Sequence, residues 1–192
     1  MELKLLRNNK IEVKNIIVRA LLEALYDVLD IDGVNSILKY ANINKNNFKE
    51  PPIEILNKLI ESMNILLYNS NKVLFEIGRK FAFYIAPFGE KIEDFYSTFE
   101  TNLQRNFKIN IIRISENNVI INVINCPFCK GKLFFPLITN VPLNLDCEFY
   151  KGFISETIKK GLSINSDFTI EHIEKSKTKC SFNIVYKNQS KI

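Results

Sequence analysis

The residues most able to bind a metal are four cysteines and one histidine, and all five lie after residue 125. The Cys126-Pro127-Phe128-Cys129 turn is typical of half a zinc-ribbon site, where backbone N–H groups stabilise two thiolates on one metal. A ribbon needs a second such pair, and the sequence has none. A redox-active pair usually opens a helix, whereas Lys130–Pro136 is predicted to be loop or extended chain.

The wider spacing of these residues indicates a different zinc site. Cys147 follows Cys126 by 21 residues, His172 follows Cys147 by 25, and Cys180 follows His172 by 8. Alternation places His172 and Cys180 on the apolar faces of two strands. With a loop at Lys175–Lys177 the two would be directly opposed, with Cβ atoms about 4.5–5.5 Å apart. Zinc bridges such a gap, with bonds of about 2.3 Å to sulfur and 2.0 Å to nitrogen.

We therefore predict a structural zinc site. Its expected ligands are Cys126, Cys147, His172 and Cys180, with Cys129 as an alternative ligand. Three cysteines and one histidine fill all four positions, which leaves no place for a catalytic water. The alternative is that the histidine is a hydrogen-bonded core residue and each cysteine a small buried hydrophobe.

The hydrophobic periodicity predicts an α+β fold, with helices packed on a small antiparallel sheet of about four strands. The expected helices are Lys14–Leu29, Val34–Ala41, Ile53–Tyr68, Val73–Ile85, Ile92–Arg105 and Asp146–Leu162. One strand hairpin is expected over Phe107–Ile124. A second combines Asp167–Ile173 with Lys179–Tyr186. We expect one domain over 1–192, mostly helical over 1–105 and strand-rich with the metal site over 106–192.

The composition limits the classes of function. Of the 192 residues, 46% are hydrophobic and 24% charged, which is ordinary for a globular protein. No apolar run is long enough for a membrane span, and the first residues lack a secretory signal, so we expect a cytoplasmic protein. The net charge is +5, but the lysines are scattered. A nucleic-acid partner is therefore not expected.

The stretch from Gly78 to Tyr186 resembles the 4-vinyl reductase domain family of predicted hydrocarbon-binding proteins. The resemblance rests on a helix containing Gly78, the Phe107–Ile124 hairpin and the Cys126–Cys129 turn. It continues through Cys147–Phe153 and a last hairpin that contains Cys180. It implies a fold shared with TRAPP transport-complex subunits and haem-based nitric-oxide sensors. It also implies a homodimer formed through the N-terminal helices, and an apolar or aromatic ligand.

The same resemblance bears on individual residues. His172 and Cys180 match two cysteines that flank a turn in the family's last hairpin, and Cys126 matches an acidic ligand of sensor members. Aromatic residues are available to line a ligand pocket between helices and sheet: Phe75, Phe81, Tyr84, Phe95, Phe99, Phe149 and Phe153. The alternative is that they form the core. Gly78 and Gly152 would either let helices approach closely or leave room for a ligand.

Three functions follow as hypotheses. The first is a sensor or carrier domain for an apolar, aromatic or acyl molecule, with structural zinc. The second is a reductase or an accessory protein of tetrapyrrole metabolism. No dinucleotide-binding fingerprint supports it, and only one histidine is available for acid–base work. The third is a dimeric scaffold subunit. Because neither the first nor the third requires a catalytic group, we expect no catalytic residues.

Overall fold

The computed structural model describes residues 15–44, 50–67, 70–86, 94, 97–98, 101, 108–115, 118–124, 148–161, 167–175 and 179–186. The helices are α2 (Ile16–Val28), α3 (Ile31–Tyr40), α4 (Pro52–Leu66), α5 (Asn71–Ile85) and α7 (Glu148–Gly161). The strands are β1 (Lys108–Ser115), β2 (Asn118–Ile124), β3 (Phe168–Lys175) and β4 (Lys179–Tyr186). The predicted α+β class is confirmed. Most of the helix expected over Ile92–Arg105 lies outside the described residues.

Side-chain caps determine where the first two helices begin. The Asn15 carboxamide accepts hydrogen bonds from the backbone N–H groups of Ile17 and Val18. The Asp30 carboxylate accepts one from Gly33 N–H at 2.7 Å. Asp30–Gly33 lies between the expected helices Lys14–Leu29 and Val34–Ala41, and it forms the cap and first turn of α3. A capping carboxylate outweighs the poor helix propensity of glycine at this point.

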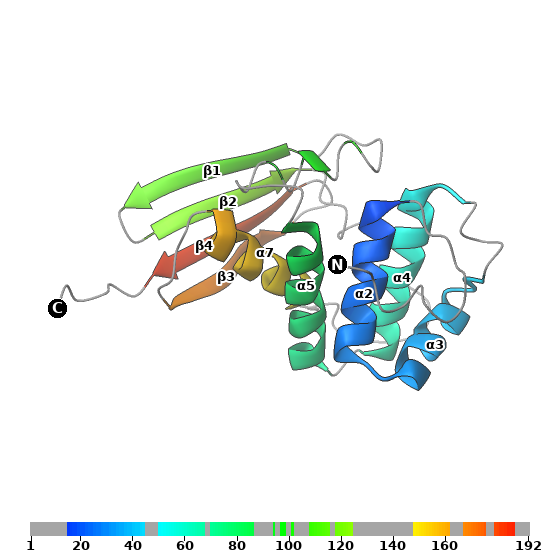
Figure 1. Cartoon of the computed structure of the whole chain (residues 1–192). Helices are drawn as coiled ribbons and strands as arrows, with labels where there is room; N and C mark the ends of the chain where they lie inside the picture. Colours follow the sequence, from blue (N-terminus) through cyan, green and yellow to red (C-terminus); the bar gives the residue numbers. More distant parts are fainter. Residues whose placement is uncertain are drawn as a thin grey trace.

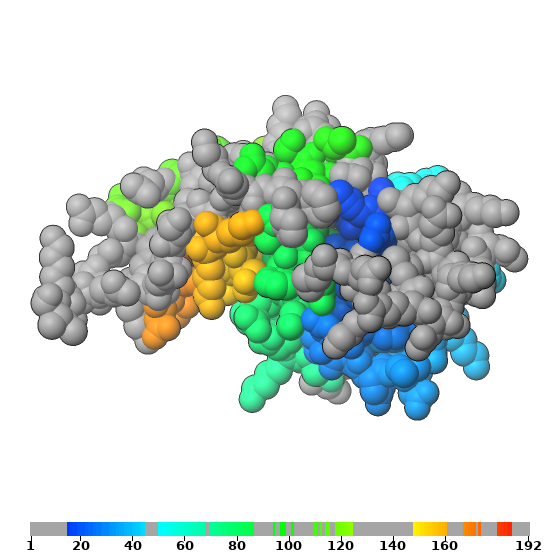
Figure 2. Space-filling view, viewed as in Figure 1, coloured from blue at the N-terminus to red at the C-terminus, as the bar shows by residue number. Residues whose placement is uncertain are grey.

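Helix α5 occupies the middle of the molecule. Figure 1 shows α2, α3 and α4 on one side of it, and α7 with the sheet on the other. Helix α5 packs against both α2 and α7. Its apolar residues Leu74, Ile77, Phe81 and Ala82 are all buried. Figure 2 shows α5 and α7 side by side on this surface of the molecule. The helical half and the sheet half are therefore joined through α5.

Helices α5 and α7 touch through their backbones at two glycines. A Cβ atom on Gly78 would lie 1.8 Å from the Phe149 carbonyl oxygen, and one on Gly152 would lie 2.0 Å from the Phe75 carbonyl oxygen. At the far end, Lys160 donates a hydrogen bond to the Ala86 carbonyl just after α5. Of the two roles considered for these glycines, close helix approach is the one observed.

The four strands form one antiparallel sheet in the order β1-β2-β4-β3. Both predicted hairpins are present, and β2 pairs with β4 to join them. One face is buried, since Val119, Ile121 and Val123 of β2 alternate with more exposed residues. The ring of Tyr150 in α7 lies 5.0 Å from that of Phe182 in β4, between centroids. Helix α7 therefore covers the buried face.

The register of the second hairpin differs from our expectation. His172 pairs with Phe182, and Cys180 pairs with Lys175. The prediction that His172 and Cys180 are directly opposed was therefore wrong. The strands continue to Lys175 and from Lys179, so the turn is centred later than assumed, and β3 has an irregularity between His172 and Glu174. Neither turn position nor strand irregularity is visible in the alternation of apolar residues.

Candidate functional site

The interior between α5, α7 and the sheet is a cluster of aromatic rings. Phe81 of α5 lies 5.7 Å from both Phe149 and Phe153 of α7, measured between ring centroids. Tyr150 stacks on Phe153 at 5.8 Å. These distances are typical of rings in direct contact. All four side chains are almost fully buried, so they pack against one another and form the core of this half of the molecule.

The seven aromatic residues predicted to line a ligand pocket therefore have different environments. Phe81, Phe149 and Phe153 pack in the core just described. Tyr84 is half-buried and donates a hydrogen bond to Asp27 across the α2–α5 contact. Phe75 lines a pocket at the surface. Phe95 and Phe99 lie outside the described residues, so the complete predicted pocket stays a prediction.

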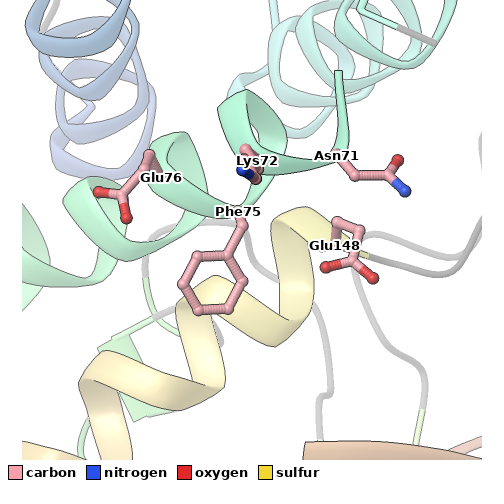
Figure 3. A pocket seen from close by; sticks show the side chains of 5 residues that line it. All are labelled: Asn71, Lys72, Phe75, Glu76 and Glu148. Atoms are coloured by element: carbon pink, nitrogen blue, oxygen red, sulfur yellow. The ribbon is translucent and has the colours of Figure 1, made fainter. Parts of the chain in front are cut away.

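The surface pocket lies where α5 and α7 begin. It has a volume of about 330 Å³ and is lined by Asn71, Lys72, Phe75, Glu76 and Glu148. Figure 3 shows the Phe75 ring between the two carboxylates. Glu76 is already paired with Arg79 at 3.0 Å, and Glu148 with Lys151 at 2.8 Å. With one ring and a charged rim, this pocket differs from the enclosed apolar sites typical of aromatic ligands.

A polar cluster connects α2 to α5. The Asp27 carboxylate accepts a hydrogen bond from Tyr84 at 2.8 Å and pairs with the Lys80 ammonium at 3.1 Å. One turn earlier on α2, Glu23 is only 6% exposed. Burial raises the pKa of Glu23 above its ordinary 4.5, the Asp27 charge raises it further, and Arg19 lowers it. The cluster therefore holds an acid at a buried helix contact.

Sequence reasoning missed this polar cluster. Glu23 and Asp27 lie four residues apart on α2, the spacing that places two acids on one face of a helix. Glu23 stands among buried neighbours such as Leu22 and Ala24. An acid inside an apolar helical segment was the available signal. The partners of Asp27 on α5, Lys80 and Tyr84, are more than fifty residues away along the chain, so they were not identifiable from local spacing.

The predicted zinc ligands are only partly within the described residues. Cys180 is 1% exposed in β4, on the same buried face as Phe182 and Ile184. His172 is placed only by its backbone in β3. Cys126, Cys129 and Cys147 lie outside the described residues. Among the residues that the structure does describe, no three His, Cys, Asp or Glu residues are grouped to hold a metal ion. The zinc site therefore stays a prediction.

The same arrangement of helices and sheet occurs in solved structures of H-NOX proteins. A mutant H-NOX from T. Tengcongensis matches with a TM-score of 0.56 and 13% identity, over 91% of this chain and 98% of that one. A mutant of the Fe(II) unliganded H-NOX protein from K. algicida matches with a TM-score of 0.55 and 11% identity, over 91% and 97%. This chain has the H-NOX fold. No protein-family model and no curated protein matches it.

Another structure with the H-NOX fold comes from work titled "Modulating Heme Redox Potential Through Protein-Induced Porphyrin Distortion". It matches with a TM-score of 0.54 and 14% identity, over 91% of this chain and 95% of that one. At such identities the likeness concerns the fold alone. Whether this chain could hold a haem must be judged from the residues of this chain.

Within the described residues, the space between α5 and α7 leaves no room for a haem. Haem iron takes a histidine, cysteine, methionine or tyrosine as its axial ligand. The chain has one histidine, His172 of β3, and its register position is opposite Phe182, on the face of the sheet toward α7. The space between α5 and α7 is closed by the backbone contacts of Gly78 and Gly152 and by the rings of Phe81 and Phe153. No step involving haem follows from this geometry.

Within the described ranges, no helix is both long enough and apolar enough to span a bilayer.

Proposed function

We propose that this chain is a small-molecule-binding sensor domain built on the H-NOX fold. The observation that supports the proposal is the fold likeness, which extends over about nine-tenths of this chain and of each solved structure compared with it. Helix α5 contacts both α2 and α7. A ligand bound against α5 would therefore act on both halves of the domain.

The proposed ligand is apolar, aromatic or acyl, rather than a histidine-bound haem. The aromatic rings around Phe81 supply apolar surface, and the Tyr84 hydroxyl is a polar group at the edge of the same helix. Phe81, Phe149 and Phe153 pack against one another, so a bound ligand must lie beside these rings rather than between them. This position agrees with the prediction that Phe95 and Phe99 also line the pocket. An apolar surface with one or two polar groups is typical of such sites.

We further propose that structural zinc stabilises the strand-rich half. The proposed ligands are Cys126, Cys147, His172 and Cys180, with Cys129 as the alternative. The burial of Cys180 and its position in the same hairpin as His172 support the proposal. As diagonal neighbours rather than opposed residues, their Cβ atoms would be roughly 7–8 Å apart. The long imidazole side chain leaves that separation within reach of one tetrahedral ion.

Membership of the 4-vinyl reductase domain family is part of the same proposal. It would account for the cysteine-containing last hairpin and for an apolar ligand on this fold. The motifs that carry it, Cys126–Cys129 and Cys147–Phe153, lie wholly or partly outside the described residues.

Thermal denaturation with added ligands tests the proposed binding. The protein is titrated separately with hemin and with a library of aromatic and acyl compounds, and a saturating ligand should raise the melting temperature by mass action. We expect stabilisation by members of the library and neither stabilisation nor a Soret shift with hemin. Failure of every apolar compound to shift the melting temperature would contradict the sensor proposal. A stoichiometric hemin complex would contradict the exclusion of haem.

A second candidate function is an interaction subunit, as in the scaffold hypothesis. One observation favours it: several large apolar side chains of the strands are exposed, among them Ile112, Ile173 and Val185. An antiparallel sheet with one solvated face normally places polar residues there. Oligomeric state alone does not separate the two functions, because a homodimer is also expected of the sensor; a purified chain that forms a stable assembly but yields no extractable ligand would favour the interaction subunit.

A further inference from the structure

The carboxyl group of Glu23 on α2 is buried without a partner. Glu23 is 6% exposed, and among the described residues it accepts no hydrogen bond and forms no ion pair. Its neighbours Leu22 and Ala24 are buried with it. Buried carboxyl groups are normally hydrogen-bonded or paired, because an isolated buried charge is costly. This environment therefore suits the neutral form of Glu23 better than the ionised form.

A cation lies one turn before Glu23 on the same helix but is not paired with it. Arg19 and Glu23 are four residues apart, a spacing at which an arginine and an ionised glutamate commonly form an ion pair. Between these two described side chains the structure has no ion pair, and the Nε atom of Arg19 is buried without a hydrogen-bond partner. The observed arrangement is that of a neutral carboxyl group, with Arg19 in reach of an ionised one.

The groups that face Glu23 lie at the contact between α2 and α5. Asp27, one turn later on α2, accepts a hydrogen bond from Tyr84 at 2.8 Å and pairs with Lys80 at 3.1 Å. The charge of Glu23 raises the pKa of Tyr84 on α5 and that of Tyr26 on α2. Helices α3 and α4 also contact α2, but no charged group described on either helix acts on Glu23. Glu23 therefore faces the bonds that join α2 to α5.

Ionisation of Glu23 would place a second carboxylate beside that of Asp27. Like charges four residues apart on a helix repel each other, and burial adds to the cost of the new charge. Both costs fall if the Glu23 side chain turns toward Arg19, which lies in the opposite direction from Asp27 along α2. Because Asp27 binds Tyr84 and Lys80 of α5, a change at this end of α2 acts on the contact between the two helices.

We propose that Glu23 is a proton-dependent switch of the α2–α5 contact. The contact is closed while the carboxyl group is neutral, and it loosens when the group ionises and turns toward Arg19. Burial first, and then the Asp27 charge, raise the pKa of Glu23 above 4.5, against the opposing effect of Arg19. Closure is therefore complete below about pH 4.5 and is lost as the pH rises through the raised pKa. This switch goes beyond the proposed ligand binding and does not require it.

Hydrogen exchange of the full chain, measured by mass spectrometry from about pH 4 to about pH 8, tests the switch. Each exchange rate is divided by the intrinsic rate at the same pH, which gives the protection of each segment. We expect the protection of Ile16–Val28 and Asn71–Ile85 to fall as the pH rises. The fall should be at most roughly tenfold per pH unit, because one proton is released. Strands β2 and β4 should keep their protection.

Three variants assign the effect to Glu23. Glu23→Gln cannot ionise, so both helices should stay protected over the whole pH range. Arg19→Gln removes the charge that lowers the pKa of Glu23, so the loss of protection should move to higher pH. Glu61→Gln is the matched control, because it removes an acid of α4, outside the α2–α5 contact. Its exchange profile should follow that of the wild type.

Three results would overturn the proposal. Protection of α2 and α5 that does not change with pH in the wild type would show that there is no switch. An unchanged pH dependence in Glu23→Gln would assign the effect to another group. A fall of equal size in β2 and β4 would show that Glu23 alters only the global stability of the fold. Ligand-induced stabilisation at constant pH reports on the proposed function separately.

Discussion

Gly78 of α5 lies against the backbone carbonyl of Phe149 in α7, where a Cβ atom would come within 1.8 Å of the oxygen. Gly152 makes the reciprocal contact with the carbonyl of Phe75. Side chains therefore do not separate the two helices at their crossing. Because α5 also contacts α2, the position of the helical half relative to the sheet depends on this crossing.

Replacement of Gly78 by alanine should destabilise the protein strongly. The new methyl group meets backbone that cannot move without shifting a helix, so we expect a loss of about 3 kcal/mol or more in the free energy of unfolding. Chemical denaturation measures it. Gly33→Ala on α3 is the control, since its Cβ atom would meet a side-chain oxygen of Asp30 at 3.0 Å rather than backbone. Equal losses in both variants would contradict the importance of the helix crossing.

The aromatic cluster should behave as packed core. Phe153 is fully buried against Phe81 and Tyr150, so Phe153→Ala should lower the free energy of unfolding by about 3–5 kcal/mol. Phe83→Ala is the matched control, because Phe83 is 49% exposed on α5. Its loss should be far smaller. If Phe153→Ala is no more destabilising than Phe83→Ala, the interior is looser than the structure indicates and the pocket alternative gains support.

Glu23 should make the stability depend on pH. Its pKa is raised in the folded protein, so the folded state binds this proton more tightly than the unfolded state does. Stability should fall as the pH rises from about 4.5, the ordinary pKa, through the folded pKa. Glu23→Gln should therefore raise the melting temperature at neutral pH, with little effect in acid. Glu61→Gln on α4 is the control, and an equal gain there would argue against a specific role of Glu23.

The Tyr84–Asp27 hydrogen bond should contribute to the contact between α2 and α5. Tyr84→Phe removes the 2.8 Å bond and keeps the ring, so we expect a loss of about 1 kcal/mol. Burial and this bond both raise the pKa of Tyr84, so in the wild type its phenol should ionise later than an ordinary tyrosine. Asp27→Asn should lower that pKa in a spectrophotometric titration. Additive losses in the double variant would show that the pair is not coupled.

The order of helices and strands and the antiparallel sheet could be predicted from the sequence. The contacts between particular residues of different elements could not. Alternation of Val119, Ile121 and Val123 was sufficient to identify β2, and the three-and-four spacing from Ile16 to Val28 identified α2. The register of His172 depended on where the turn falls and on an irregularity, neither of which changes the apolar pattern. The role of Gly78 required knowledge of its partner helix.

The candidate site was predictable only in part. The aromatic residues of α5 and α7 do come together, but Phe81, Phe149 and Phe153 fill the space that a pocket would need. The sequence cannot distinguish a packed aromatic core from a ligand pocket lined by aromatic residues, because both require the same side chains. The exposed apolar side chains of β1, Ile112 and Ile114, were also missed. Strand alternation predicts polar residues at exposed positions, and it cannot predict where an apolar residue takes their place.

Native mass spectrometry of the purified protein tests the proposed sensor function most directly. A bound zinc ion and a bound apolar molecule each add a defined mass to the chain. We expect one zinc per chain, reduced in Cys180→Ala, together with an organic ligand released by mild activation. A bare chain of native stability, with neither zinc nor ligand, would contradict both proposals.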